Sequence, residues 1–141
     1  MNIYAESSAV AAWLLREPQG SDIYAILVAA THVVSSDLTL VECDRAIQRG
    51  TATRRMSPAA AKSASSDLTA TAAKWDIVNL LPSIVERARQ PFPSEPIRTL
   101  DALHVAWALH ARAAIPDLAI LSLDDRIRRV AESVGFALLP S

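Results

Sequence analysis

The sequence predicts a three-layer α/β/α protein built around a parallel β-sheet. Short, apolar, β-prone runs alternate along the chain with longer segments of helical periodicity, and the connections between them are short. Such connections between parallel strands place helices on both faces of the sheet. Because 141 residues suffice for one two-sided core, and no linker or internal repeat divides them, we expect a single domain over residues 1–141.

Five apolar runs are typical of buried parallel strands. Each run is too short for a helix and is bounded by polar or turn-forming residues. The runs are residues 3–5, 31–35, 77–80, 118–121 and 136–139.

Segments of helical periodicity fill the spaces between these runs. We expect Ser7 or Ser8 to cap the first helix, Ser57 the fourth and Thr99 the sixth. Gly50 is expected to end the third helix. The expected helices cover residues 9–14, 21–30, 37–50, 58–74, 82–88, 99–113 and 126–133, with a proline-rich loop at 90–96.

The bulk composition excludes several classes of protein. The single cysteine, Cys43, rules out an internal disulfide and a cysteine-based zinc site. No apolar run is long enough to cross a bilayer, and the first twenty residues lack the pattern of a signal peptide. We therefore expect a cytoplasmic protein without a membrane segment. The net charge of −1 does not by itself indicate a nucleic-acid binder.

The basic residues are almost all arginines and fall into clusters. Arg45 and Arg49 belong to one cluster and Arg126 to another. The planar guanidinium favours phosphate and carboxylate partners, so these three are candidates for contacts with phosphate groups. For any single one of them, a solvated helix face is an equally good interpretation.

Four acidic residues follow the expected strands at the same end of the sheet. These are Glu6 after the first strand, Glu42 after the second, Asp101 after the proline-rich loop and Asp124 after the fourth. The carboxyl ends of parallel strands are where ligands bind in open α/β sheets. An acid near a helix N-terminus can also simply complement the helix dipole, which is the alternative for each residue alone.

The apolar neighbours of these acids indicate a metal site. Semi-buried carboxylates that lie close together repel one another unless a cation sits between them. Oxygen ligands without cysteines or paired histidines suit Mg²⁺ or Mn²⁺. Such ions orient water and stabilise the charge of a phosphodiester during hydrolysis.

Four short motifs resemble those of PIN-domain ribonucleases, in particular the VapC toxins of bacterial toxin–antitoxin pairs. They occur in the order and with the spacing of that family and span nearly the whole chain. The motifs are YAESSAV at residues 4–10, SSDLTLVE at 35–42, RTLDALHVA at 98–106 and LSLDDR at 121–126.

The resemblance implies a five-stranded parallel sheet and Mg²⁺- or Mn²⁺-dependent cleavage of RNA by an endoribonuclease toxin. It also implies a homodimer that a small VapB-like antitoxin neutralises. The catalytic and metal-binding acids are then Glu6, Glu42, Asp101 and Asp124. Ser8 and Ser122 are implied as polar helpers.

Two residues in these motifs leave alternatives open. The family normally has aspartate where this chain has Glu6, and the extra methylene moves the carboxylate by about 1.5 Å. The alternative function is therefore a PIN-fold binding protein with impaired catalysis. Asp125 either adds a ligand or caps the last helix, and we favour capping.

Other chemistries fit the sequence less well. Ser8 lacks the Gly-x-Ser-x-Gly turn of many serine hydrolases. A phosphoacceptor receiver domain needs paired acids after its first strand and a lysine after a later one, and the chain has neither. His104 is one turn beyond Asp101, and we expect it to be a satisfied, partly buried histidine rather than a ligand.

Overall fold

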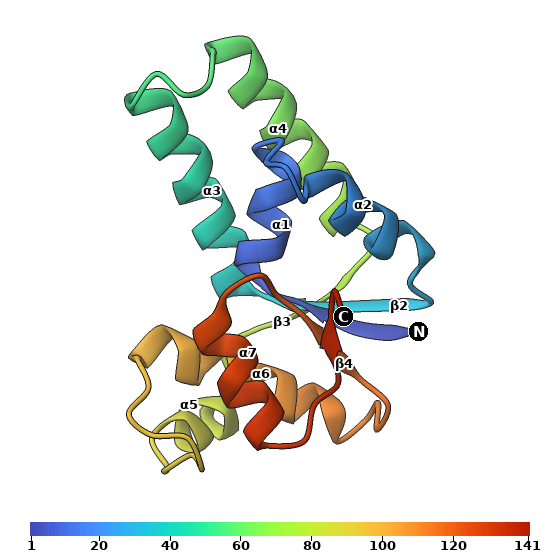
Figure 1. Cartoon of the computed structure of the whole chain (residues 1–141), viewed down its shortest axis with the longest axis vertical. Helices are drawn as coiled ribbons and strands as arrows, with labels where there is room; N and C mark the ends of the chain where they lie inside the picture. The colour runs from blue at the N-terminus through green and yellow to red at the C-terminus, as the bar shows by residue number, and fades with distance from the viewer.

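The computed structural model describes residues 1–141 and contains a five-stranded parallel sheet between two layers of helices (Figure 1). The strands are β1 (Asn2–Ala5), β2 (His32–Ser36), β3 (Asp76–Val78), β4 (Ala119–Leu121) and β5 (Leu138–Leu139). Their order across the sheet is β3-β2-β1-β4-β5, and every neighbouring pair is parallel. All five carboxyl ends therefore lie along one edge of the sheet.

Seven helices cover the two faces of the sheet. In Figure 1, α1 (Ser7–Leu14), α2 (Gly20–Ala29), α3 (Asp37–Ala52) and α4 (Pro58–Ala72) lie above the sheet. The helices α5 (Pro82–Ala88), α6 (Thr99–Arg112) and α7 (Asp125–Ser133) lie below it. None of the seven combines the length and the hydropathy that a bilayer crossing needs.

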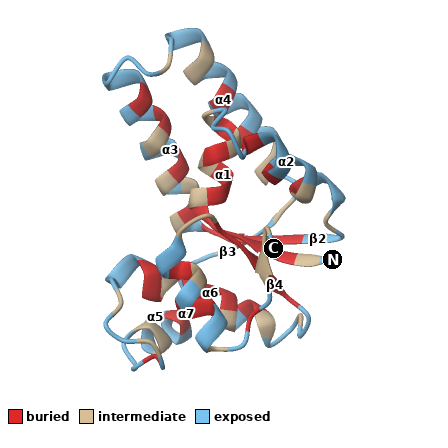
Figure 2. Ribbon diagram, viewed as in Figure 1, coloured by how far each residue is buried: buried red, intermediate tan, exposed pale blue.

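The core consists of two apolar layers, one on each side of the sheet. Successive side chains of a strand point to opposite faces, so Ile3 and Ala5 pack against α1 to α4, whereas Tyr4 packs against α6 and α7. Figure 2 shows the buried residues concentrated in the central strands and on the helix faces that contact them. Burial on both sides explains why these strands appear in the sequence as continuous apolar runs.

The structure confirms the fold class and shifts several helix boundaries. Ser57 caps α4 as predicted, since its hydroxyl accepts a hydrogen bond from the N–H of Ala60. The helix α3 was expected to end at Gly50 but continues to Ala52, because the chain does not turn away until Arg54, whose φ is 58°.

Three predicted helix caps are wrong. Glu6, not Ser7 or Ser8, caps α1, because its longer side chain reaches the N–H of Ser8. The helix α6 begins at Thr99 itself, after an extended residue that forms no side-chain cap. Asp124 caps α7, so Asp125 is the first helical residue and not the cap.

Candidate active site

Four carboxylates line one pocket of about 470 Å³ at the carboxyl edge of the sheet. Glu6 directly follows β1, and Glu42 lies in the second turn of α3. Asp101 is in the first turn of α6, and Asp124 lies between β4 and α7. The parallel topology thus brings together all four acids that the sequence analysis selected. Two arginines, Arg49 and Arg98, share the lining with them.

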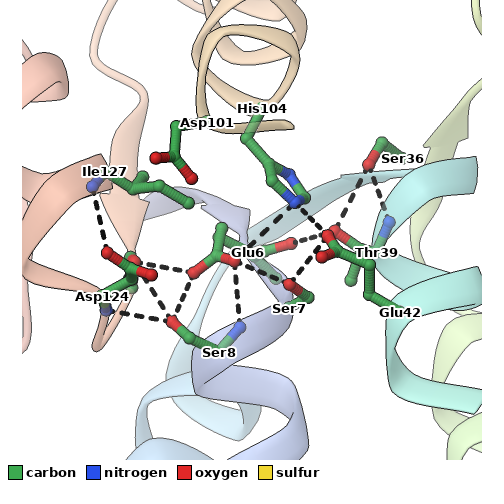
Figure 3. A network of polar contacts seen from close by, with 12 residues as sticks. Glu6, Ser7, Ser8, Ser36, Thr39, Glu42, Asp101, His104, Asp124 and Ile127 are labelled. Carbon is green, nitrogen blue, oxygen red and sulfur yellow. Dashed lines mark hydrogen bonds and ion pairs between the residues drawn. The ribbon is translucent and has the colours of Figure 1, made fainter. Parts of the chain in front are cut away.

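Glu6 lies at the centre of the polar network in Figure 3, and its side chain is held by serines. Only 2% of the residue is exposed. Its Oε1 accepts hydrogen bonds from the Ser7 hydroxyl at 2.7 Å and from the Ser8 N–H at 3.0 Å. Its Oε2 accepts one from the Ser8 hydroxyl and one from the Ser122 hydroxyl, the latter at 2.7 Å. Four donors therefore satisfy both oxygens of this buried carboxylate.

Ser8 and Ser122 connect Glu6 to the fourth acid. The Ser8 hydroxyl accepts hydrogen bonds from the N–H groups of Leu123 at 2.9 Å and Asp124 at 3.1 Å. The Ser122 hydroxyl accepts a second hydrogen bond from Asp124 N–H, at 3.1 Å. The two serines therefore fix the turn after β4 against the start of α1, as residues that support the site.

Glu42 and His104 form the second part of the pocket. The Nε2 of His104 lies 2.5 Å from Oε1 of Glu42 and 3.7 Å from Oε1 of Glu6. Burial by itself raises the pKa of Glu42, but the hydrogen bonds from His104 and Ser7 and the charge of His104 outweigh it and lower that pKa. Glu42 is therefore held in its ionised form. His104 is only 1% exposed, so it is more deeply buried than the sequence analysis predicted.

A buried chain of hydroxyl groups supports His104 through its Nδ1 atom. Its Nδ1 lies 3.2 Å from the hydroxyl of Tyr4, which donates a hydrogen bond to Ser36 at 3.0 Å. The chain continues through Thr39 to the carbonyl oxygen of Ala5. Burial raises the pKa of Tyr4 above its ordinary value, so the phenol stays protonated. The imidazole is thus fixed between the sheet and Glu42.

Arg98 engages the remaining two acids. Its Nε lies 3.1 Å from Oδ2 of Asp101, and its Nη2 lies 3.8 Å from Oδ2 of Asp124. The hydrogen bond and the charge of Asp101 raise the pKa of Arg98. The other oxygen of Asp124 accepts hydrogen bonds from Arg126 N–H and Ile127 N–H and so caps α7. Asp101 and Asp124 are therefore ion-paired with a side chain that is itself 59% exposed.

The donor atoms of this pocket suit a divalent cation. One ligand atom from each of Glu6, Glu42 and His104 lies within 4.8 Å of the other two. Carboxylate oxygens dominate the set, which fits Mg²⁺ or Mn²⁺, and the single imidazole is a nitrogen ligand. Four carboxylates face two arginines and one histidine in the lining, so the pocket keeps an excess of negative charge that a cation would balance.

The candidate phosphate-binding arginines are distributed unevenly. Arg49 lines the acidic pocket from α3. Arg126 is exposed on α7 and borders a neighbouring pocket instead. Arg45 is exposed on α3 outside the lining of both pockets. Asp125 is exposed at the start of α7 and does not line the acidic pocket.

Two residues that were not predicted to belong to the site line its pocket, namely His104 and Arg98. The sequence analysis noted that His104 lies one turn of α6 beyond Asp101 but expected it to be a satisfied histidine and not a ligand. Arg98 is in the same motif as Asp101, but no pattern in the sequence indicated that its guanidinium would turn toward two of the acids.

The fold and the pocket define the class of this protein as a three-layer α/β/α domain with an acidic site at the carboxyl edge of its parallel sheet. The chain belongs to the PIN domain family, because the sequence model of that family matches residues 3–133. The family and the fold that the motifs predicted are thereby confirmed.

Relatives with assigned names match almost the whole chain. Ribonuclease VapC46 of Mycobacterium tuberculosis is 30% identical over 138 residues, which are 97% of this chain and 95% of that protein. Ribonuclease VapC35 of the same organism is 28% identical over 139 residues, with the same coverage. The crystal structure of PAE2754 from Pyrobaculum aerophilum aligns with 98% of this chain and 83% of its own, with a TM-score of 0.61. At 14% identity, this last likeness supports the fold alone.

Proposed function

We propose that this protein is a metal-dependent endoribonuclease that acts as the toxin of a type II toxin–antitoxin system. The observation that carries the proposal is the convergence of Glu6, Glu42, Asp101 and Asp124 on one pocket. The names of the VapC relatives support RNA as the substrate, since both are called ribonucleases.

We propose Mg²⁺ or Mn²⁺ as the cofactor, held by the four acids with His104 beside them. When bound, the cation supplies an activated water and neutralises charge on the phosphodiester. The protein's own part is to orient the ligands: the serines fix Glu6, and His104 keeps Glu42 ionised. Arg98 compensates the charges of Asp101 and Asp124, and it would have to release their oxygens if these acids bound the cation.

The similarity to VapC proteins also supports a proposal of two protein partners. We propose a VapB-like antitoxin that neutralises the activity and a second copy of the chain in a homodimer. The site would then act on RNA in the cytoplasm.

Cleavage of RNA by the purified protein with and without Mn²⁺ tests this proposal. Asp101→Asn should lose most of the cleavage activity, because asparagine keeps the shape of aspartate but carries no charge. Asp67→Asn, an exposed position on α4, is the matched control and should cleave like the wild type. Identical RNA ladders from the wild type and Asp101→Asn, over a range of substrates, would show that the pocket is not the site of a nuclease.

A further inference from the structure

A second, smaller pocket adjoins the acidic one on the side of α7. Its volume is about 190 Å³, and it lies between α7 and the proline-containing loop before α6. The two pockets share Arg98 and Asp101 in their linings. Three of the residues around the smaller pocket are arginines, namely Arg98, Arg126 and Arg129, and we call it the arginine pocket.

Two of these arginines have no partner within the chain. Arg126 and Arg129 are exposed, and neither takes part in any of the ion pairs of the structure. Their neighbour Arg128 behaves differently: its guanidinium donates to the carbonyl oxygens of Ser122, Leu139 and Pro140 at 2.9 to 3.1 Å. The helix α7 thus uses one arginine to hold the fold and leaves two at the pocket.

The net charge of the arginine pocket is positive. The only acid in its lining is Asp101, whose side chain is 6% exposed and already paired with Arg98. The Nε and Nη2 atoms of Arg98 face carboxylates, which leaves Nη1 for another partner. Three cations around one buried and compensated acid make a site for an anion, and guanidinium groups bind phosphate in the fork geometry.

The position of the arginine pocket beside the four acids indicates which anion it would bind. In Figure 3, Asp124 and Ile127 mark the α7 side of the acidic pocket, and Glu42 marks the α3 side. Arg49 lines the acidic pocket from α3, and the arginine pocket adjoins the acidic pocket on its α7 side. A phosphodiester chain whose scissile group lies at the acids therefore has an arginine on each side of it.

We propose that the arginine pocket is a phosphate subsite that holds an RNA phosphate next to the scissile one. Arg126 and Arg129 are the phosphate-binding residues, and Arg98 joins the subsite to the acids. This inference rests on the proposed nuclease function and adds the path of the RNA strand, from α3 across the acids to α7.

The test is RNA binding by a variant that lacks both unpaired arginines. We would measure the fluorescence anisotropy of a labelled single-stranded RNA 12-mer in EDTA, where no divalent ion is present, over a series of salt concentrations. Arg126→Gln/Arg129→Gln should raise Kd several-fold. It should also reduce the slope of log K against log salt by about 0.7, because the subsite holds one phosphate and each phosphate contact to a single strand contributes about 0.7.

A charge-matched control separates local contacts from the overall field. Arg54→Gln/Arg55→Gln removes the same number of charges at the exposed connection between α3 and α4, which lies far from α7 in Figure 1. The control should keep the salt slope of the wild type. Equal Kd values and slopes for the two double variants would overturn the proposal, and so would an Arg126→Gln/Arg129→Gln variant that binds RNA like the wild type. The latter result would also be expected if the pocket held an acidic peptide.

The cleavage assay keeps the two proposals apart. If the wild type cleaves RNA and Arg126→Gln/Arg129→Gln raises KM more than it lowers kcat, the subsite is supported. If the wild type cleaves RNA but this variant has an unchanged KM and Kd, the subsite is wrong and the nuclease stands. If the wild type cleaves no RNA, the anisotropy result still decides whether the arginine pocket binds it.

Discussion

The Nε2 atom of His104 lies 2.5 Å from Oε1 of Glu42, although the two residues are 62 positions apart in the chain. One is on α6 below the sheet and the other on α3 above it, so this contact joins the two helical layers across the carboxyl edge. It also stabilises the ionised form of a half-buried carboxylate, whose pKa burial alone would raise. The contact therefore contributes to the fold and to the charge of the pocket at once.

The first prediction concerns the pH dependence of stability. The pKa of Glu42 is lowered from its ordinary value of 4.5, so its ionised form stabilises the fold above that pH, and this contribution is lost as the pH falls through the folded pKa. Glu42→Gln should lower the free energy of unfolding at pH 7 by about 1.5–3 kcal/mol, the range for a hydrogen bond to a charged group. Urea denaturation from pH 7 down to pH 3 should show the difference shrinking below pH 4.5. A difference that stays constant over the whole series would mean that His104 does not stabilise the charge of Glu42.

The second prediction concerns the serine between Glu6 and Asp124. Ser122 is fully buried, donates to Oε2 of Glu6 and accepts from the N–H of Asp124. Ser122→Ala leaves the turn after β4 and the buried carboxylate each with one hydrogen bond fewer, which should cost about 1–3 kcal/mol of the free energy of unfolding. Ser66→Ala, at an exposed position of α4, should change it by less than about 0.5 kcal/mol in the same urea titration. Equal effects of the two substitutions would refute the supporting role of Ser122.

The third prediction tests Glu6, at the position where the resemblance to PIN-domain ribonucleases implies an aspartate. Aspartate is a favourable helix cap, so in Glu6→Asp the carboxylate of residue 6 should still accept the hydrogen bond from the N–H of Ser8 at the start of α1. The shorter side chain no longer reaches all four donors, which leaves an oxygen free for a cation. We expect tighter Mn²⁺ binding by isothermal titration calorimetry and faster RNA cleavage. Unchanged or weaker Mn²⁺ binding would show that the glutamate does not impair the site.

Much of the fold was predictable because its signals are local or periodic. The runs that became β1 and β4 are apolar on both faces, as buried parallel strands must be, and the polar residues directly after them mark the edge where ligands bind. The motifs around Glu6, Glu42, Asp101 and Asp124 then placed four acids at that edge, and the structure brings them to one pocket.

The details that sequence reasoning missed depend on contacts between distant segments. Whether His104 faces the core or the pocket is decided by Tyr4 and Glu42, each at least 62 positions away. Arg98 was overlooked because its side chain is mostly exposed and only its direction makes it part of the site. Likewise, Glu6 displaces Ser7 and Ser8 as the cap because the neighbouring serines hold its carboxylate over the first turn of α1.

The fourth prediction compares the same substitution at two glycines. A Cβ at Gly20, where α2 begins against α1, would lie 2.6 Å from the carbonyl oxygen of Ala12 and 3.1 Å from Cα of Trp13. Both neighbours are backbone atoms, so Gly20→Ala should force the helices apart and cost about 1–3 kcal/mol.

A Cβ at Gly50 would meet only the side chain of Met56, with Sδ at 2.9 Å and Cγ at 3.0 Å. This thioether is flexible and can shift. Alanine is also favoured over glycine within a helix by about 1 kcal/mol, and Gly50 lies inside α3. Gly50→Ala should therefore change the free energy of unfolding by less than about 1 kcal/mol, because the two effects offset each other. Urea denaturation of both variants measures the difference in their free energies of unfolding. A Gly50→Ala protein as unstable as Gly20→Ala would mean that Met56 is held as rigidly as the backbone between α1 and α2.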